Sequence, residues 1–138
     1  MQRLRSAALV HDIGKIGIPD SIINKPGPPD ESEWKMINRH PELGAVIISH
    51  MPDLVPCAPI VRHHHEWYDG SGYPDRLESS EIPFESRVIA VAEAYDAMIN
   101  MRPYHQPLLH EEAVDELRNC SGTQFDPVIV AAFLRTMQ

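Results

Sequence analysis

Imidazole and carboxylate side chains, the groups that most often bind divalent metals and move protons, recur along this sequence, which has eight histidines in 138 residues. The first pair is His11-Asp12. A neutral imidazole offers one lone pair to a metal, and a carboxylate can bridge two cations with its two oxygens. Lys15 follows Asp12 by about one helical turn, so its ammonium could reach the same cavity. A surface ion pair or a capped helix end is the alternative for this pair taken alone.

Three consecutive histidines followed by a glutamate occupy positions 63–66. Neighbouring side chains on a helix point about 100° apart, so we expect at most two of these rings to share a site. A histidine tract on the surface is the alternative. His40 is a further candidate because Pro41 after it should break a helix and leave the ring at the break. An ordinary surface position is the alternative for His40.

Two carboxylates, Glu93 and Asp96, lie three residues apart among mostly apolar neighbours, so they share one face of a predicted helix. A carboxylate on an apolar face is destabilising unless it is paired or bound to a metal. We therefore expect at least one of the two to be functional.

Taken together, these candidates place one or two nitrogen or oxygen donors on each of four helices, which is how helical bundles build metal centres in their cores. A mixed histidine and carboxylate set without thiolate favours iron, manganese or another borderline-to-hard divalent ion over a structural zinc. A set of more than four ligands indicates two or more divalent metal ions. The predicted ligands are His11, Asp12, His40, His64, His65 and Glu93.

The elements that must position these residues are helices, because apolar residues recur at helical spacing between thirteen prolines and strand-like alternation is almost absent. We predict an all-α fold, a bundle of about six helices. Asp30 and Glu33 match a capping box, and Asp126 should cap the last helix. The predicted helices span residues 4–13, 30–47 with a break near His40, 59–67, 83–99, 109–120 and 127–133.

The composition of the chain disfavours several classes of protein. A chain of 15.6 kDa with 43% hydrophobic and 23% charged residues is typical of one globular domain. We expect neither a membrane span nor a secretory signal, since no apolar run is long enough. Twelve basic against twenty acidic residues disfavour binding to a nucleic-acid polymer but allow a small phosphate ligand beside bound metals. Cys57 and Cys120 are expected to be reduced thiols of a cytoplasmic protein.

The whole pattern resembles the HD-GYP domain, the branch of the HD phosphohydrolases that acts on cyclic di-GMP. The matching motifs follow the family's order and cover nearly the whole chain. They are HDIGKIGIPD at 11–20, NKPG at 24–27, HP at 40–41, HHEWYDGSGYP at 64–74, IPFESRVIAVAEAYDAM at 82–98, RPY at 102–104 and QFDP at 124–127.

This resemblance implies an all-helical fold with a two- or three-metal centre that hydrolyses the 3′–5′ phosphodiester of cyclic di-GMP to pGpG or GMP. It also implies that Asp12 bridges ions and that Asp12 and Lys15 are the catalytic residues. Lys15 and Arg102 match residues that contact the ligand's phosphates. The loop Gly72-Tyr73-Pro74 matches the family's substrate-binding loop, which also contacts GGDEF-domain proteins. The positions that match metal ligands are His11, Asp12, His40, His64 and His65.

Several positions depart from the family pattern. Glu93 stands where the family usually has aspartate, His105 stands where arginine or lysine is common, and His63 has no clear counterpart. The family domain also begins earlier, with upstream helices that carry another metal-binding histidine. We therefore expect either that residues 1–138 are an HD-GYP domain truncated at its N-terminus, or that another segment or subunit completes it. A second copy of the chain, in a homodimer, is one of the candidate partners.

Three functions are compatible with these observations. The leading prediction is a metal-dependent phosphodiesterase for cyclic di-GMP. The alternative is a catalytically impaired module that binds cyclic di-GMP or a GGDEF-domain partner without turnover, as the departures would favour. A phosphohydrolase for mononucleotides is disfavoured, because the resemblance links the motifs DGSGYP and RPY to the cyclic dinucleotide.

Overall fold

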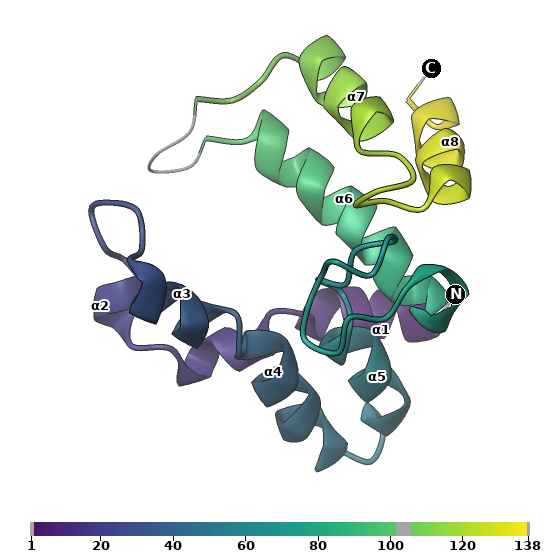
Figure 1. Ribbon diagram of the computed structural model, residues 1–138. Helices are drawn as coiled ribbons and strands as arrows, with labels where there is room; N and C mark the ends of the chain where they lie inside the picture. The colour runs from purple at the N-terminus through teal and green to yellow at the C-terminus, as the bar shows by residue number, and fades with distance from the viewer. Residues whose placement is uncertain (1, 102–105, 138) are drawn as a thin grey trace.

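The computed structural model describes residues 2–101 and 106–137, and these residues fold as an all-α protein (Figure 1). The described part of the chain contains no strand, only two isolated bridges that pair Asp69 with Glu78 and Ser121 with Phe125. This confirms the predicted fold class. The same residues form eight α-helices, two of them only four and five residues long, where the sequence predicted about six.

The first half of the chain contains α1 (Gln2–Val10), η1 (Ile13–Gly17), α2 (Asp20–Ile23), α3 (Glu31–Ile37), α4 (His40–Ser49), η2 (Val55–Cys57) and α5 (Ala58–Arg62). The predicted break near His40 is confirmed, because α3 ends at Ile37 and Pro41 lies in the first turn of α4. Proline is tolerated there because first-turn N–H groups have no partner within the helix.

The capping box of α3 is also confirmed. The Asp30 carboxylate accepts from the backbone N–H of Ser32 and Glu33 at 2.8 and 3.0 Å. The Glu33 carboxylate accepts from the N–H of Asp30 at 2.7 Å, so both halves of the motif are present.

The helix predicted over residues 59–67 is shorter than expected, because α5 ends at Arg62. The chain beyond it pairs instead with the segment before α8, where Tyr68 N–H donates to Gln124 O at 3.2 Å and Asp69 N–H donates to Thr123 O at 2.9 Å. These long-range backbone hydrogen bonds replace the helical ones. The periodicity of the local sequence could not reveal them. The short helix α2 was also missed.

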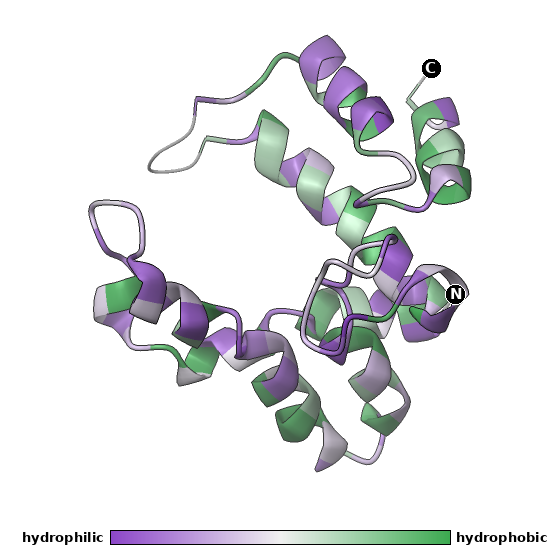
Figure 2. Ribbon diagram, viewed as in Figure 1, coloured by the Kyte–Doolittle hydropathy of each residue, from purple (hydrophilic) through white to green (hydrophobic). Residues whose placement is uncertain are grey.

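The second half contains η3 (Ser79–Glu81), α6 (Phe84–Ile99), α7 (His110–Asn119) and α8 (Pro127–Arg135). The long helix α6 runs from the N-terminal half towards the α7–α8 pair in Figure 1. Its Ile89 belongs to a buried cluster with residues of α1, α4 and α5, whereas Val91 belongs to a second cluster with residues of α7 and α8. Figure 2 shows apolar residues along α6 and α8 and mainly hydrophilic ones on α7. Helix α6 therefore joins two small cores.

Asp126 fixes the start of α8 and ties it to α6. Its Oδ1 accepts from the backbone N–H of Val128 at 2.8 Å and of Ile129 at 3.4 Å, as the predicted cap requires. Its Oδ2 accepts from the guanidinium of Arg87 on α6. Because Asp126 is only 5% exposed, loss of Arg87 would leave a buried carboxylate without a counter-ion.

Two general expectations can be compared with the described residues. Cys57 and Cys120 are both free thiols. Among the described helices, none combines the length and the apolar character that crossing a bilayer requires.

Candidate metal centre

Three of the predicted ligands, His11, His40 and His64, are anchored to the last turn of the helix that precedes them. In each case ring Nδ1 lies within hydrogen-bond distance of the carbonyl three residues earlier. A carbonyl can only accept, so Nδ1 carries the proton and Nε2 keeps its lone pair for a ligand. The Nδ1–O distances are 2.7 Å from His11 to Ala8, 2.7 Å from His40 to Ile37 and 2.6 Å from His64 to Val61.

The Nε2 atoms of His40, His64 and His65 meet in the interior. His40 Nε2 lies 3.4 Å from His64 Nε2 and 3.2 Å from His65 Nε2, and both His40 and His64 are 1% exposed. Burial lowers the pKa of His64 to about 3 and that of His65 to about 2, so these rings are neutral at pH 7. His40 and His64 therefore turn lone pairs towards each other, an arrangement that a shared cation would stabilise.

A second group of donors comprises His11, Asp12 and Glu93, whose ligand atoms all lie within 4.8 Å of one another. Asp12 links the two groups. Its Oδ1 is 3.3 Å from His40 Nε2, and its Oδ2 is 3.6 Å from His11 Nε2. Oδ1 is buried yet accepts no hydrogen bond from any described residue. A buried carboxylate oxygen without a partner is costly, so its position fits an atom that binds a cation.

Burial and neighbouring charges act on the pKa values of the two carboxylates in this second group. Burial alone would raise the pKa of Asp12, but the contacts with His40 and with the Lys15 ammonium hold it well below its usual value. Lys15 Nζ donates to Asp12 Oδ2 at 2.6 Å. Burial raises the pKa of Glu93, and the neighbouring Asp12 carboxylate adds to this.

The six predicted ligands therefore come together in the structure as two adjoining groups of nitrogen and oxygen donors. Neutral imidazoles with free Nε2 atoms, an ionised carboxylate between them and an unused buried oxygen are the features that divalent ions require of a protein. The residues present thus fit a centre of two or more ions without thiolate ligands.

His63 points to a different site. Its Nδ1 donates to Pro59 O at 2.7 Å, and its Nε2 lies 2.9 Å from Asp75 Oδ2. The Arg62 guanidinium also binds Asp75, with two hydrogen bonds of 2.7 Å. Because α5 ends before the three histidines, His64 and His65 can both turn inward, which consecutive residues on a helix could not do.

The loop Gly72-Tyr73-Pro74 packs against His65, one of the donors. The Tyr73 ring stacks on His65 with centroids 5.1 Å apart, and Tyr73 N–H donates to His65 O at 3.3 Å. A Cβ at Gly72 would lie 2.2 Å from Trp67 N, so only glycine allows this approach. Their predicted role in substrate binding stays a prediction, as does that of Arg102, which lies outside the described residues along with His105.

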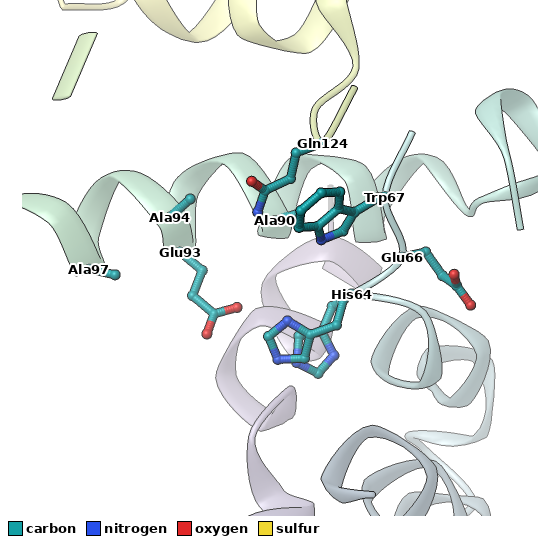
Figure 3. A pocket seen from close by; sticks show the side chains of 9 residues that line it. His64, Glu66, Trp67, Ala90, Glu93, Ala94, Ala97 and Gln124 are labelled. Atoms are coloured by element: carbon teal, nitrogen blue, oxygen red, sulfur yellow. The ribbon is translucent and has the colours of Figure 1, made fainter. Parts of the chain in front are cut away.

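Two cavities adjoin the donor groups, and Glu93 lines both. The larger, of about 460 Å³, contains the predicted catalytic pair, and its lining residues are Ala8, His11, Asp12, Lys15, Ile89, Ala92, Glu93 and Asp96. The smaller, of about 150 Å³, lies beside the histidines, and its lining residues are His64, His65, Glu66, Trp67, Ala90, Glu93, Ala94, Ala97 and Gln124. Figure 3 shows the Glu93 carboxylate directed towards His64, and Trp67 beside Gln124.

Sequence reasoning missed Trp67 and Gln124, although both belong to quoted motifs. Neither is a metal-binding residue type. They become neighbours only through the backbone pairing of Tyr68 with Gln124.

Comparison with known proteins identifies relatives of the chain. The chain matches the HD domain family model over residues 1–129. It is 44% identical over 134 residues to a cyclic di-GMP phosphodiesterase of Thermotoga maritima and 42% identical over 134 residues to the cyclic di-GMP phosphodiesterase response regulator RpfG of Xanthomonas campestris. It is 38% identical over 133 residues to 3′3′-cGAMP-specific phosphodiesterase 2 of Vibrio cholerae.

These matches cover 96, 96 and 95% of the chain but only 36, 35 and 26% of the relatives, so the chain spans about a third of their length or less. A crystal structure of a cyclic GMP-AMP-specific phosphodiesterase of Vibrio cholerae superposes with a TM-score of 0.68. That match covers 98% of this chain and 37% of the other at 20% identity, so it speaks for the fold alone.

Proposed function

Since the chain belongs to the HD domain family, we propose that it carries the hydrolytic centre of a metal-dependent phosphodiesterase that cleaves cyclic di-GMP to pGpG or GMP. The observation that carries this proposal is the position of Asp12. Its two oxygens face two separate groups of donors, and the buried one has no hydrogen-bond partner among the described residues. The relatedness to cyclic dinucleotide phosphodiesterases supplies the substrate class.

The proposed metal ligands are divided between the two groups, with Asp12 shared. Iron or manganese suits this set of imidazole and carboxylate donors. When bound, such ions acidify a water molecule and offset the charge of a phosphate. The ligands are His40, His64 and His65 in one group and His11 and Glu93 in the other.

The protein's own groups would orient the substrate and balance its charge. Lys15 lines the larger cavity with a half-exposed side chain and is held towards the centre by Asp12. An ammonium placed there can bind a non-bridging phosphate oxygen and stabilise charge that develops during cleavage. The protonated Nδ1 atoms of the anchored histidines fix their ring orientation, so that Nε2 always faces the centre.

The test compares Asp12→Asn with Asp20→Asn, a matched change at an exposed position of α2. Each protein would be loaded with manganese or iron, its metal content measured by mass spectrometry, and its hydrolysis of cyclic di-GMP followed by chromatography. We expect two or more ions per chain and turnover in the parent and the control, and loss of both in Asp12→Asn. Full turnover by Asp12→Asn, or a parent chain without bound metal, would contradict the proposal.

A further inference from the structure

The smaller cavity is bounded by Trp67, an aromatic side chain that none of the proposed chemistry uses. Trp67 is 39% exposed and lies beside Gln124 at the same cavity as His64 (Figure 3). A volume of about 150 Å³ matches one aromatic ring, and because the cavity opens to solvent where Trp67 is exposed, a two-ring base can lie partly inside it and partly on the indole. Its contents would therefore lie directly beside the proposed metal ligands.

The backbone at Trp67 is held on two sides. Gly72 packs so closely against Trp67 N that a side chain there would collide with it. On the other side, the next residue, Tyr68, donates its N–H to Gln124 O at 3.2 Å. A flat side chain on such a fixed backbone is a preorganised stacking surface, because little entropy is lost when a ligand binds to it.

Another part of the cavity lining comes from α6. Ala90, Ala94 and Ala97 recur there at helical spacing, and their small side chains leave space between the helix and the indole. In the described part of the chain, neither the Gln124 side-chain amide nor the Trp67 indole N–H makes a hydrogen bond. The cavity thus combines an aromatic face, small apolar side chains and polar groups without a hydrogen-bond partner among the described residues.

We infer that this cavity binds a purine base of the substrate, with the base stacked on the Trp67 indole. The Gln124 amide offers one acceptor and two donors, which suit the hydrogen-bonding edge of guanine. This inference rests on the proposed function, because the phosphodiester, which is joined to the base through the ribose, would then lie near His64, His65 and Glu93, which line the same cavity. Trp67 acts in binding and is not a catalytic residue.

The first experiment compares Trp67→Leu with Trp67→Phe in the manganese-loaded chain. Leucine keeps the apolar bulk but removes the flat face, whereas phenylalanine keeps a ring. Loss of one base–aromatic stack weakens binding about 5- to 150-fold. We expect Trp67→Leu to raise KM for cyclic di-GMP and the inhibition constant of GMP by such a factor, with Trp67→Phe affected less. Inhibition by inorganic phosphate, which has no base, should stay unchanged.

Equal changes for GMP and inorganic phosphate, or no change for either, would overturn the inference while leaving the proposed hydrolysis intact.

The second experiment needs no turnover. The chain has only two tryptophans, so Trp34→Phe leaves Trp67 as the single indole. We expect its fluorescence to be quenched on titration with cyclic di-GMP, and a flat titration would overturn the inference. Quenching in a protein that never hydrolyses the ligand would support base binding and contradict the proposed function.

Discussion

Replacing Gly14 by alanine tests how the η1 segment places Asp12 against His40. Gly14 is buried, and a Cβ built on it would lie 1.9 Å from His40 O and 2.5 Å from Gly44 N. Both atoms belong to the backbone of α4, so rotation of a side chain cannot relieve the collision. Ordinary contact begins at 3.4 Å, and the two segments must therefore separate by about 1.5 Å.

The cost follows from this displacement. Overpacking a buried site costs about 1 to 3 kcal/mol, and a collision with backbone belongs at the upper end. With an unfolding entropy of about 2.1 cal/mol/K per residue, a loss of about 3 kcal/mol lowers the Tm of this chain by roughly 10 °C. Metal ligands tolerate errors of only about 0.2 Å, so Gly14→Ala should also lose bound metal.

The assay is thermal unfolding by circular dichroism of metal-free protein, followed by metal analysis after reloading. Two other glycines serve as controls. Gly17→Ala meets only Leu43 Cδ1, at 3.1 Å, which can move, and Gly27→Ala meets nothing within 4 Å. We expect Gly27→Ala to keep or slightly raise the Tm, because alanine restricts the unfolded chain. A Gly14→Ala protein that melts within about 2 °C of the parent and retains its metal would refute this reasoning.

Three further changes have distinct expected outcomes. Asp126→Ala removes the cap of α8 and leaves the largely buried Arg87 without its partner. Urea unfolding should therefore show a loss of about 2 to 4 kcal/mol. Asp126→Asn keeps the cap but removes the charge, so it should lose less, and equal losses would mean that the cap contributes nothing. His64→Ala should lower metal content measured by mass spectrometry, whereas His63→Ala should not, because His63 faces another carboxylate. Lys15→Met should lower kcat about 100-fold with unchanged metal content, and a parent-like kcat would exclude a role for this ammonium.

Features encoded by neighbouring residues were predictable from the sequence. Pro41 divided α3 from α4, and the caps at Asp30 and Asp126 formed as their residue types indicate. The residues chosen as ligands were also brought together, since a mixed set of imidazoles and carboxylates distributed over several helices is chemically distinctive. Their ligand role itself stays a prediction.

Features that depend on distant contacts were not predictable. Helix α5 ends early because the backbone that follows it pairs with residues near Gln124, about sixty positions later. The same pairing places Trp67 at the cavity beside His64. The spacing of apolar residues indicates which side chains share one face of a helix. It does not indicate which distant segment a loop forms hydrogen bonds with.

The anchoring of three imidazoles to terminal carbonyls of α1, α3 and α5 has a kinetic consequence. Each anchor lasts only while the final turn of its helix is closed, and end turns open far more often than the middle of a helix. Fraying of one helix end would let a single ring swing away while the other donors stay in place. Exchange of ions with solvent would then proceed through these local openings, without unfolding of the protein.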